Sequence, residues 1–381
     1  MFYNLGMRIG IDARLWSQTG VGRYIRNLVL NLQNLDKENE YTLFVRPKDY
    51  DKVKIQISNP KFRISKINIK WHSLGEQARF PAILDKEKLD LMHFPYFSVP
   101  VFYKRPYIVT IHDLIINHFP TGKASTLSKP LYESKLLAYK YVIKKAAKNS
   151  KKIIAVSNAT KDEIIDHLGV SADKVKVIYN GIEEEFKNQK PKIKNKDYGM
   201  YFLYVGNAYP HKNLERLIQA FSKVKFQETG TGSQELKLVL VGKRDFFYQR
   251  LEKDTRAKNI KNVEFRYDVD DENLLSLYAN ALALAFPSLM EGFGLPALEA
   301  MACGCPVLAS ETPSLREVCK DAALYFNPNS TDSIKDSLEF IIGNLELRDK
   351  MIEKGRKRAK EFSWKKAAQE TLLLYQEILN S

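Results

Sequence analysis

The sequence predicts an α/β protein of two domains, each built on a parallel sheet. The chain has 381 residues, about twice the length of a typical domain. Short apolar segments typical of strands alternate with longer amphipathic segments typical of helices, the pattern of parallel sheets with helical crossovers. A polar, lysine-rich stretch at 183–199 interrupts this alternation near the middle. We interpret it as a linker and expect a second domain to begin after it.

The first half contains one complete α/β series. Residues 8–12 form the first expected strand and residues 22–35 the first expected helix, because Tyr24, Leu28 and Leu32 recur at helical spacing. The further strands expected in this half are 41–45, 89–93, 107–111, 152–156 and 175–179. We assign residues 1–185 to an N-terminal domain, which the C-terminal helix 364–381 is expected to complete.

A second series starts after the linker. The expected strands are 201–205, 236–241, 263–265, 281–286 and 307–309, and residues 214–221 form a helix. We assign residues 186–363 to a C-terminal domain. Two such Rossmann-like domains are expected to face each other across a cleft, with ligands near the carboxyl ends of the strands.

Composition excludes several classes of protein. A hydrophobic share of 44% is too high for a disordered chain, and no apolar stretch approaches the ~20 residues that span a bilayer. The opening residues 1–11 lack the features of a secretory signal, so we expect a cytoplasmic protein. The three cysteines, Cys303, Cys305 and Cys319, are expected to be reduced thiols packed as small hydrophobes.

The net charge of +15 is concentrated in the first half. Residues 123–152 contain nine lysines against one acid, Glu133, with apolar residues between them. This pattern predicts a basic amphipathic helix. Three interpretations remain open: a surface for anionic lipid headgroups, a surface for nucleic acid, or a solvated face with no partner.

The densest chemical information lies in the segment PSLMEGFGLPALEAMACGCPVLAS of the second half. Gly292 and Gly294 allow a tight turn and close approach of a ligand to the backbone. Pro296 suits the first position of a helix and Gly304 the position after its end, so a helix is expected over 296–303. The N–H groups at the start of such a helix bind anionic oxygens, and a diphosphate is the natural ligand.

Two glutamates flank this turn. Glu291 precedes the helix and Glu299 lies inside it, so the two carboxylates are expected to meet different parts of one extended ligand. The alternative is a solvated loop residue and an acid favoured by the helix dipole.

The pair, with the residues GFGLP between them, resembles the paired-glutamate motif of the retaining glycosyltransferases of family 4, which have the GT-B architecture. Further segments resemble that family along almost the whole chain, in its mannosyltransferase-like members of bacterial polysaccharide and lipid-linked glycan synthesis. They are Gly20–Tyr24, Thr110–Asp113, Val156–Thr160, Tyr179–Ile182, Tyr204–Gly206 and His211–Asn213.

The resemblance implies an acceptor-binding N-terminal domain, a nucleotide-sugar donor-binding C-terminal domain, and the roles of the site residues. Catalytic positions would be Glu291 on the donor sugar, His112 against sugar and acceptor, and Lys212 on the leaving diphosphate. The donor-binding positions would be Glu299 on the ribose, with Gly292, Phe293, Gly294, Leu295, Gly206, Asn207, Lys243 and Arg244. Gly20, Gly22 and Arg14 would form a phosphate and acceptor loop.

One departure from the family concerns the second positive charge of the diphosphate clamp. Many relatives have arginine where this chain has Asn207. Arg14, Lys243 or Arg244 are the candidates to replace it.

The resemblance also implies a reaction. A retaining enzyme would move a sugar, mannose from GDP-mannose as the first choice, to a hydroxyl of a glycan or polyprenol-linked glycan, without cofactor or metal ion. It would associate peripherally with the anionic inner face of the cytoplasmic membrane and bind no nucleic acid. The alternatives are a GT-B epimerase or phosphorylase and a basic nucleic-acid-binding protein. A dinucleotide dehydrogenase lacks its glycine fingerprint after the first strand.

Overall fold

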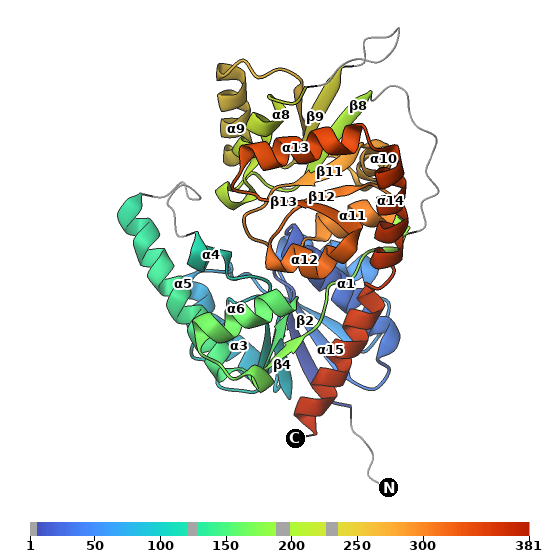
Figure 1. Ribbon diagram of the computed structural model, residues 1–381. Coiled ribbons are helices and arrows are strands. Elements are labelled where there is room, and N and C mark those ends of the chain that lie inside the picture. The colour runs from blue at the N-terminus through green and yellow to red at the C-terminus, as the bar shows by residue number, and fades with distance from the viewer. Residues whose placement is uncertain (1–5, 120–127, 188–198, 226–234, 381) are drawn as a thin grey trace. The chain divides into compact units, whose positions relative to one another are not determined.

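The computed structural model describes residues 6–119, 128–187, 199–225 and 235–380 (Figure 1). The chain divides into two compact units: unit 1 contains residues 1–181 and 363–381, and unit 2 contains residues 182–362. The predicted boundary after residue 185 falls inside α7 (Glu184–Lys187), which lies in unit 2. Most of the predicted linker, residues 188–198, lies outside the described residues.

Unit 1 is built on a seven-stranded sheet in the order β3-β2-β1-β4-β5-β6-β7, and its strands pair in parallel. The strands are β1 (Arg8–Asp12), β2 (Glu40–Val45), β3 (Phe62–Lys66), β4 (Leu91–Phe94), β5 (Tyr107–Ile111), β6 (Lys152–Ala155) and β7 (Val175–Val177). The helices are α1 (Gly20–Leu35), α2 (Tyr50–Gln56), α3 (Leu74–Lys86), α4 (Ile115–His118), α5 (Lys129–Asn149), α6 (Asn158–Leu168) and α15 (Trp364–Leu379).

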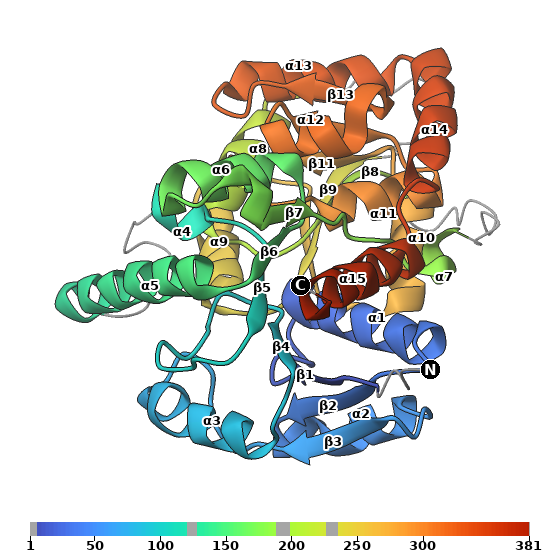
Figure 2. The same cartoon turned by 90° about the horizontal axis from the view of Figure 1, so that it is seen from below.

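The last helix of the chain belongs to unit 1, where α15 packs beside α1 (Figure 2). A buried series of hydrogen bonds fixes it there. His93 on β4 pairs through Nδ1 with the Tyr375 hydroxyl at 2.6 Å and through Nε2 with Thr110 Oγ1 at 2.8 Å. The Tyr24 hydroxyl of α1 lies 3.1 Å from the same threonine oxygen. Burial lowers the pKa of His93 to about 3, so the network holds a neutral imidazole.

Unit 2 is built on a six-stranded parallel sheet in the order β10-β9-β8-β11-β12-β13. The strands are β8 (Met200–Val205), β9 (Leu236–Gly242), β10 (Val263–Tyr267), β11 (Ala283–Phe286), β12 (Val307–Ser310) and β13 (Ala323–Phe326). Besides α7, the helices are α8 (Leu214–Phe221), α9 (Phe246–Ala257), α10 (Asp271–Asn280), α11 (Leu295–Cys303), α12 (Pro313–Cys319), α13 (Thr331–Ile342) and α14 (Leu345–Ala359). In chain order the strands run 3-2-1-4-5-6, the doubly wound order whose direction reverses between β8 and β11.

The predicted α/β class is confirmed, and each strand expected from the sequence is present within a few residues of its expected bounds. Two strands were not anticipated, β3 and β13, and each lies at a sheet edge. Helix α11 agrees with the expected 296–303 to within one residue, and Gly304 ends it in the left-handed region at φ 74°. The three cysteines are free and buried, as expected.

The basic segment also forms the helix that its sequence predicts. It is α5, which covers 129–149, while 123–127 lie outside the described residues. Among the helices of the described parts of the chain, none is long and apolar enough to cross a membrane.

The start of α1 offers a matched test of backbone packing. A Cβ at position 22 would lie 2.6 Å from the carbonyl oxygens of Leu15 and Trp16, whereas a Cβ at position 20 would meet nothing within 4 Å. We predict that Gly22→Ala lowers the free energy of unfolding by about 1–3 kcal/mol, because the backbone must shift. Gly20→Ala should change it by less than about 1 kcal/mol. Denaturant titrations of both variants check this, and equal effects would contradict the packing argument.

Candidate functional site

The reversal of strand order in unit 2 marks the place where a ligand is expected. In open parallel sheets, ligands bind outside the carboxyl ends of the strands where the order reverses. Here those strands are β8 and β11. Gly206 and Asn207 directly follow β8, and the turn that contains Glu291 follows β11. Five of the predicted site residues, 291–295, therefore lie beyond a strand at the reversal point.

The segment after β8 is fastened to the segment after β11 by main-chain and amide contacts. The Leu289 N–H donates to the His211 carbonyl oxygen at 2.8 Å. Asn213 adopts the left-handed conformation, with φ 61°, and its Nδ2 donates to the carbonyl oxygens of Pro287 at 3.1 Å and Pro328 at 2.7 Å. These bonds fix the residue between His211 and Asn213, which is Lys212, against the turn.

Lys212 and Glu291 form the central ion pair of this site. Lys212 Nζ donates to Glu291 Oε1 at 2.6 Å, and their side chains are only 12% and 9% exposed. The ammonium also lies 5.8 Å from the centroid of the Phe286 ring, at the end of β11. A nearly buried pair is costly to break, because each partner would leave an uncompensated charge. The pair therefore places one cation and one carboxylate at known positions beyond the sheet.

Two buried tyrosines shape the turn after β8. The Tyr204 hydroxyl donates to the Asn207 carbonyl oxygen at 2.7 Å, and the Tyr248 hydroxyl donates to the Gly206 carbonyl oxygen at 2.9 Å. Burial, together with the charge of Glu291, raises the pKa of Tyr204 well above its ordinary value, so this hydroxyl stays protonated. A Cβ at Gly206 would lie 2.6 Å from the Tyr204 hydroxyl oxygen, which explains the need for glycine at this position.

Lys243 and Arg244 lie at the end of β9, beside this turn. Both side chains are exposed, and the Arg244 guanidinium lies 5.7 Å from the centroid of the Tyr267 ring. Val241 of β9 is in register with Val205 of β8, so the two cations follow the strand that neighbours Asn207. They remain the candidates for the second positive charge of a diphosphate clamp.

The glycine turn leads directly into α11. Gly294 adopts the left-handed conformation at φ 96° and precedes Leu295, the first helical residue. Gly292 and Phe293 are buried. Glu299 lies in the middle of the helix, 2% exposed, where its Oε2 accepts from the Tyr278 hydroxyl at 2.9 Å. Its carboxylate is thus held by α10, separately from the Lys212 contact of Glu291.

The remaining predicted residues lie in unit 1. His112 directly follows β5, and its Nε2 lies 2.9 Å from the Pro95 carbonyl oxygen. A carbonyl only accepts, so Nε2 carries the proton and Nδ1 presents a lone pair. The Tyr24 ring contacts His112 edge-on at 5.0 Å between centroids. Burial lowers the pKa of His112 to about 4, so the ring is neutral at pH 7.

Arg14 is placed differently from the predicted phosphate loop. Its side chain is 1% exposed, and its Nη2 lies 2.6 Å from both Asp12 Oδ2 and Glu76 Oε1. These two carboxylates of unit 1 balance the charge of Arg14. Its Cζ also lies 4.0 Å from the centroid of the Phe80 ring. Arg14 is therefore buried and ion-paired within unit 1. Of the two loop glycines, Gly22 serves the close approach to Leu15 and Trp16.

Two residues of the site, Tyr248 and Tyr278, escaped the sequence analysis. Each acts through a hydrogen bond, Tyr248 to a backbone oxygen and Tyr278 to a carboxylate 21 residues away, and neither periodicity nor motif spacing reports such contacts. Tyr204 and Asn213 lie in segments that resemble the family, but their hydrogen bonds were not anticipated. Asn213 carried a further signal, because asparagine before a helical segment favours the left-handed conformation and the capping position.

The sequence models of two families match the chain, one in each half. The one described as Glycosyltransferase Family 4 matches residues 18–186, and the one described as Glycosyl transferases group 1 matches residues 184–358. The second match contains the ion pair and the glycine turn. The first contains His112 and the start of α1.

Individual proteins are similar over much of the chain. The O-antigen chain mannosyltransferase B of Escherichia coli is 29% identical over 388 residues, which cover 94% of this chain and 96% of that protein. The O-antigen chain mannosyltransferase RfbU of Salmonella typhimurium is 31% identical over 235 residues, covering 61% and 60%. Among solved structures, Anabaena HepE in complex with UDP and glucose has a TM-score of 0.75 at 18% identity, with 97% and 100% coverage.

The Lys212–Glu291 pair can be tested through stability. We predict that Lys212→Met and Glu291→Gln each lower the free energy of unfolding by about 2 kcal/mol or more, since each leaves a nearly buried charge unpaired. The double variant should lose less than the sum, with a coupling of about 1–3 kcal/mol. The exposed Lys350–Glu346 pair on α14 is the control, with a coupling under about 0.5 kcal/mol. Denaturant unfolding of the variants of both double-mutant cycles measures the two couplings. Strictly additive losses of stability at Lys212 and Glu291 would contradict the pairing.

Proposed function

The chain belongs to the glycosyltransferases of the GT-B fold, with a family 4 N-terminal part and a group 1 C-terminal part, and we propose that it transfers mannose from GDP-mannose, with retention, to a hydroxyl of a growing cell-surface glycan. Membership confirms the predicted fold family and enzyme class. The observation that carries the finer proposal is the nearly buried Lys212–Glu291 pair at the reversal point of the unit 2 sheet.

The sugar is proposed from the relatives. Both curated relatives described above are O-antigen chain mannosyltransferases, and one of them aligns along almost the whole chain. HepE, a protein of similar fold, holds UDP and glucose, which supports a nucleotide diphosphate donor without deciding the base. We therefore propose a mannose-containing polysaccharide, such as an O-antigen chain or its lipid-linked precursor, as the acceptor.

The unit 2 geometry supports separate roles for Lys212, Glu291 and Glu299 in binding the donor. When the donor binds, its diphosphate would replace Glu291 as the partner of Lys212, and the ammonium would stabilise the charge that develops on the leaving group. Glu291 would then accept hydrogen bonds from the sugar hydroxyls, which orients the transferring carbon. The N-terminus of α11 would add its positive dipole end near the phosphates. Glu299, held by Tyr278, would accept hydrogen bonds from the ribose.

Unit 1 would supply the acceptor side. The lone pair on His112 Nδ1 would accept a hydrogen bond from a sugar or acceptor hydroxyl, and Gly20 would leave room for a ligand near the start of α1. For retention, the leaving diphosphate would take the proton of the acceptor hydroxyl as that hydroxyl attacks from the same face. We propose that Lys212 and the α11 dipole provide the counter-charge in place of a metal ion, so no cofactor would be needed.

Replacement of Glu291 tests the proposed site. We predict that Glu291→Gln lowers the rate of GDP release from GDP-mannose, with octyl α-mannoside as acceptor, by about 10²–10³-fold, because positioning and charge at the reacting sugar are lost. Glu311→Gln, which removes an exposed carboxylate of unit 2, is the control and should keep full activity. UDP-glucose supplied in place of GDP-mannose should be a poor donor. Wild-type rates in folded Glu291→Gln enzyme would refute the assignment.

We also propose that α5 docks the enzyme on an anionic membrane surface. Its lysines 135, 140, 144, 145 and 148 are exposed. On the same helix Leu131, Leu137 and Tyr141 are 46%, 69% and 57% exposed, while Ile143 and Ala147 face the core of unit 1. Figure 2 shows the helix extending away from the rest of its unit. Exposed apolar side chains among cations suit a headgroup surface, where each lysine contributes about 1 kcal/mol.

Charge reversal tests this docking surface. The variant with Lys140, Lys144, Lys145 and Lys148 all changed to Glu should lose binding to phosphatidylglycerol vesicles in a flotation assay, because attraction becomes repulsion. Its turnover of the water-soluble octyl mannoside should not change. Reversal of Lys350, Lys354, Lys357 and Lys360, exposed lysines on and just after α14, matches the change in charge and should leave vesicle binding intact. Equal binding by both variants would exclude α5 as the membrane surface.

A further inference from the structure

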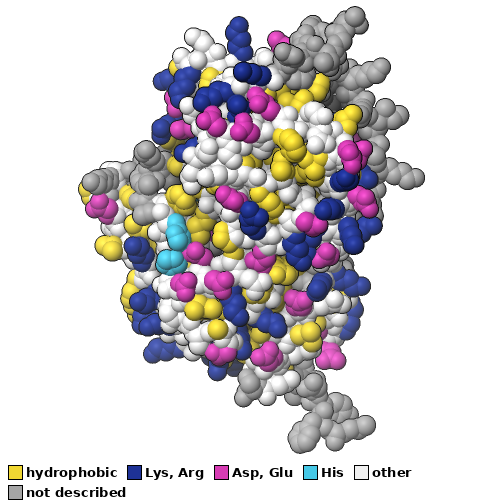
Figure 3. Space-filling model, viewed as in Figure 1, with side chains coloured by type: hydrophobic (Ala, Val, Ile, Leu, Met, Phe, Trp, Pro, Cys, Tyr) yellow, Lys and Arg dark blue, Asp and Glu magenta, His cyan; other side chains and the backbone are white. Residues whose placement is uncertain are grey.

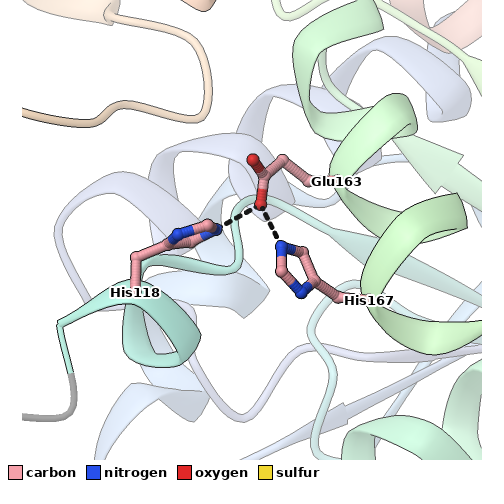
Figure 4. Close-up of side chains that lie close together, drawn as sticks. All are labelled: His118, Glu163 and His167. Carbon is pink, nitrogen blue, oxygen red and sulfur yellow. Dashed lines mark hydrogen bonds and ion pairs between the residues drawn. The ribbon is translucent and has the colours of Figure 1, made fainter.

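Within the described parts of the chain, one group of three side chains could hold a metal ion, and it lies outside the donor site. His118 ends α4, and Glu163 and His167 lie one turn apart on α6 (Figure 4). Glu163 Oε2 lies 2.5 Å from His118 Nε2 and 3.3 Å from His167 Nε2. Figure 4 shows both rings directing a nitrogen at the same carboxylate oxygen. The three donor atoms lie within 4.8 Å of one another.

The residues differ from an ordinary surface ion pair in their chemistry. Two imidazoles and one carboxylate form a common donor set for zinc, and imidazole nitrogen also suits nickel and copper. Zinc binds histidine nitrogen at about 2.0–2.1 Å, so donor atoms already this close need little movement to share one ion. The side chains are 35%, 30% and 40% exposed, and histidine side chains reach the surface on this face of the molecule (Figure 3). An ion would have direct access and a water ligand to complete its shell.

We propose that His118, Glu163 and His167 bind one divalent transition-metal ion, with zinc as the best fit. In the present arrangement Glu163 Oε2 is hydrogen-bonded to His118 Nε2 and lies at ion-pair distance from His167 Nε2. With an ion bound, each ring would give its Nε2 lone pair to the ion and carry its one proton on Nδ1. Glu163 remains as the third ligand through one oxygen. No bond of a substrate is made or broken in this step.

The position of the site suggests what the ion does. Helix α4 begins three residues after His112 and ends at His118. Helix α6 already contacts that turn, because the Thr160 hydroxyl donates to the His112 carbonyl oxygen at 3.4 Å. An ion held by both helices would cross-link α4 to α6 and stiffen the turn that carries His112. It would be a structural clamp on unit 1 and would take no part in the proposed sugar transfer.

Metal titration of the full-length protein tests the site directly. Zn²⁺ competition against a chromophoric chelator should show one site per chain in the wild type. Replacement with Co²⁺ should give the visible absorption of a four-coordinate ion with nitrogen and oxygen ligands. His118→Ala and His167→Ala should each weaken Zn²⁺ binding about tenfold or more, the scale known for disturbing a metal ligand. Zn²⁺ should raise the unfolding temperature of the wild type and not of these variants.

Two controls keep the result interpretable. Asp162→Asn removes the same charge from α6 as Glu163→Gln but no ligand, and His72→Ala removes an exposed histidine elsewhere in unit 1. Both should bind Zn²⁺ like the wild type, whereas Glu163→Gln should bind it less tightly. Equal Zn²⁺ affinity in the wild type and in the folded His118→Ala/His167→Ala double variant would overturn the proposal. Failure of this site would leave the donor site unaffected, since GDP release from GDP-mannose is measured separately with a chelator present.

Discussion

The hydrogen bonds that hold the segment after β8 against the turn after β11 are the constraint on which the proposed site of unit 2 depends. Parallel strands deliver both segments to the same edge of the sheet, but a loop at such an edge is free to take many conformations. Asn213 restricts it by binding two carbonyl oxygens, and the Leu289–His211 bond sets the register. Lys212 is thereby held against Glu291, with the two side chains 12% and 9% exposed. In the proposed function, this cation and this carboxylate would exchange each other for the diphosphate and the sugar of the donor.

In unit 1, hydrogen bonds among buried neutral side chains hold the helices against the sheet. Tyr24 is shared by two contacts: its hydroxyl lies beside Thr110, and its ring packs on His112. The same threonine is hydrogen-bonded to His93, which is hydrogen-bonded to Tyr375 of the last helix. Helix α15 is thus connected to the strand that carries His112 through three side chains. Because burial keeps both histidines neutral at pH 7, the network places hydrogen-bonding groups without fixing a charge.

The elements of this fold could be predicted where the local signal was strong. Helix α11 was expected because proline and glycine mark its two ends, and the buried strands because their apolar runs are continuous. Strands β3 and β13 were missed, although the other two edge strands, β7 and β10, were expected. The sequence FRISK of β3 contains only two apolar residues, too few to mark a strand. Contacts between distant residues were also beyond reach. The ion pair of Arg14 with Glu76 was not anticipated, because Glu76 lies 62 residues away along the chain. The His118, Glu163 and His167 group had no motif at all, because its members come from two helices.

The central claim is that the edge of the unit 2 sheet holds a sugar nucleotide through Lys212, Glu291 and the start of α11. A crystal structure of the protein with GDP-mannose tests this most directly. The account predicts diphosphate oxygens within hydrogen-bond distance of Lys212 Nζ, a sugar hydroxyl on the Glu291 carboxylate and the ribose on Glu299. A donor bound elsewhere, with the Lys212–Glu291 ion pair intact, would contradict it.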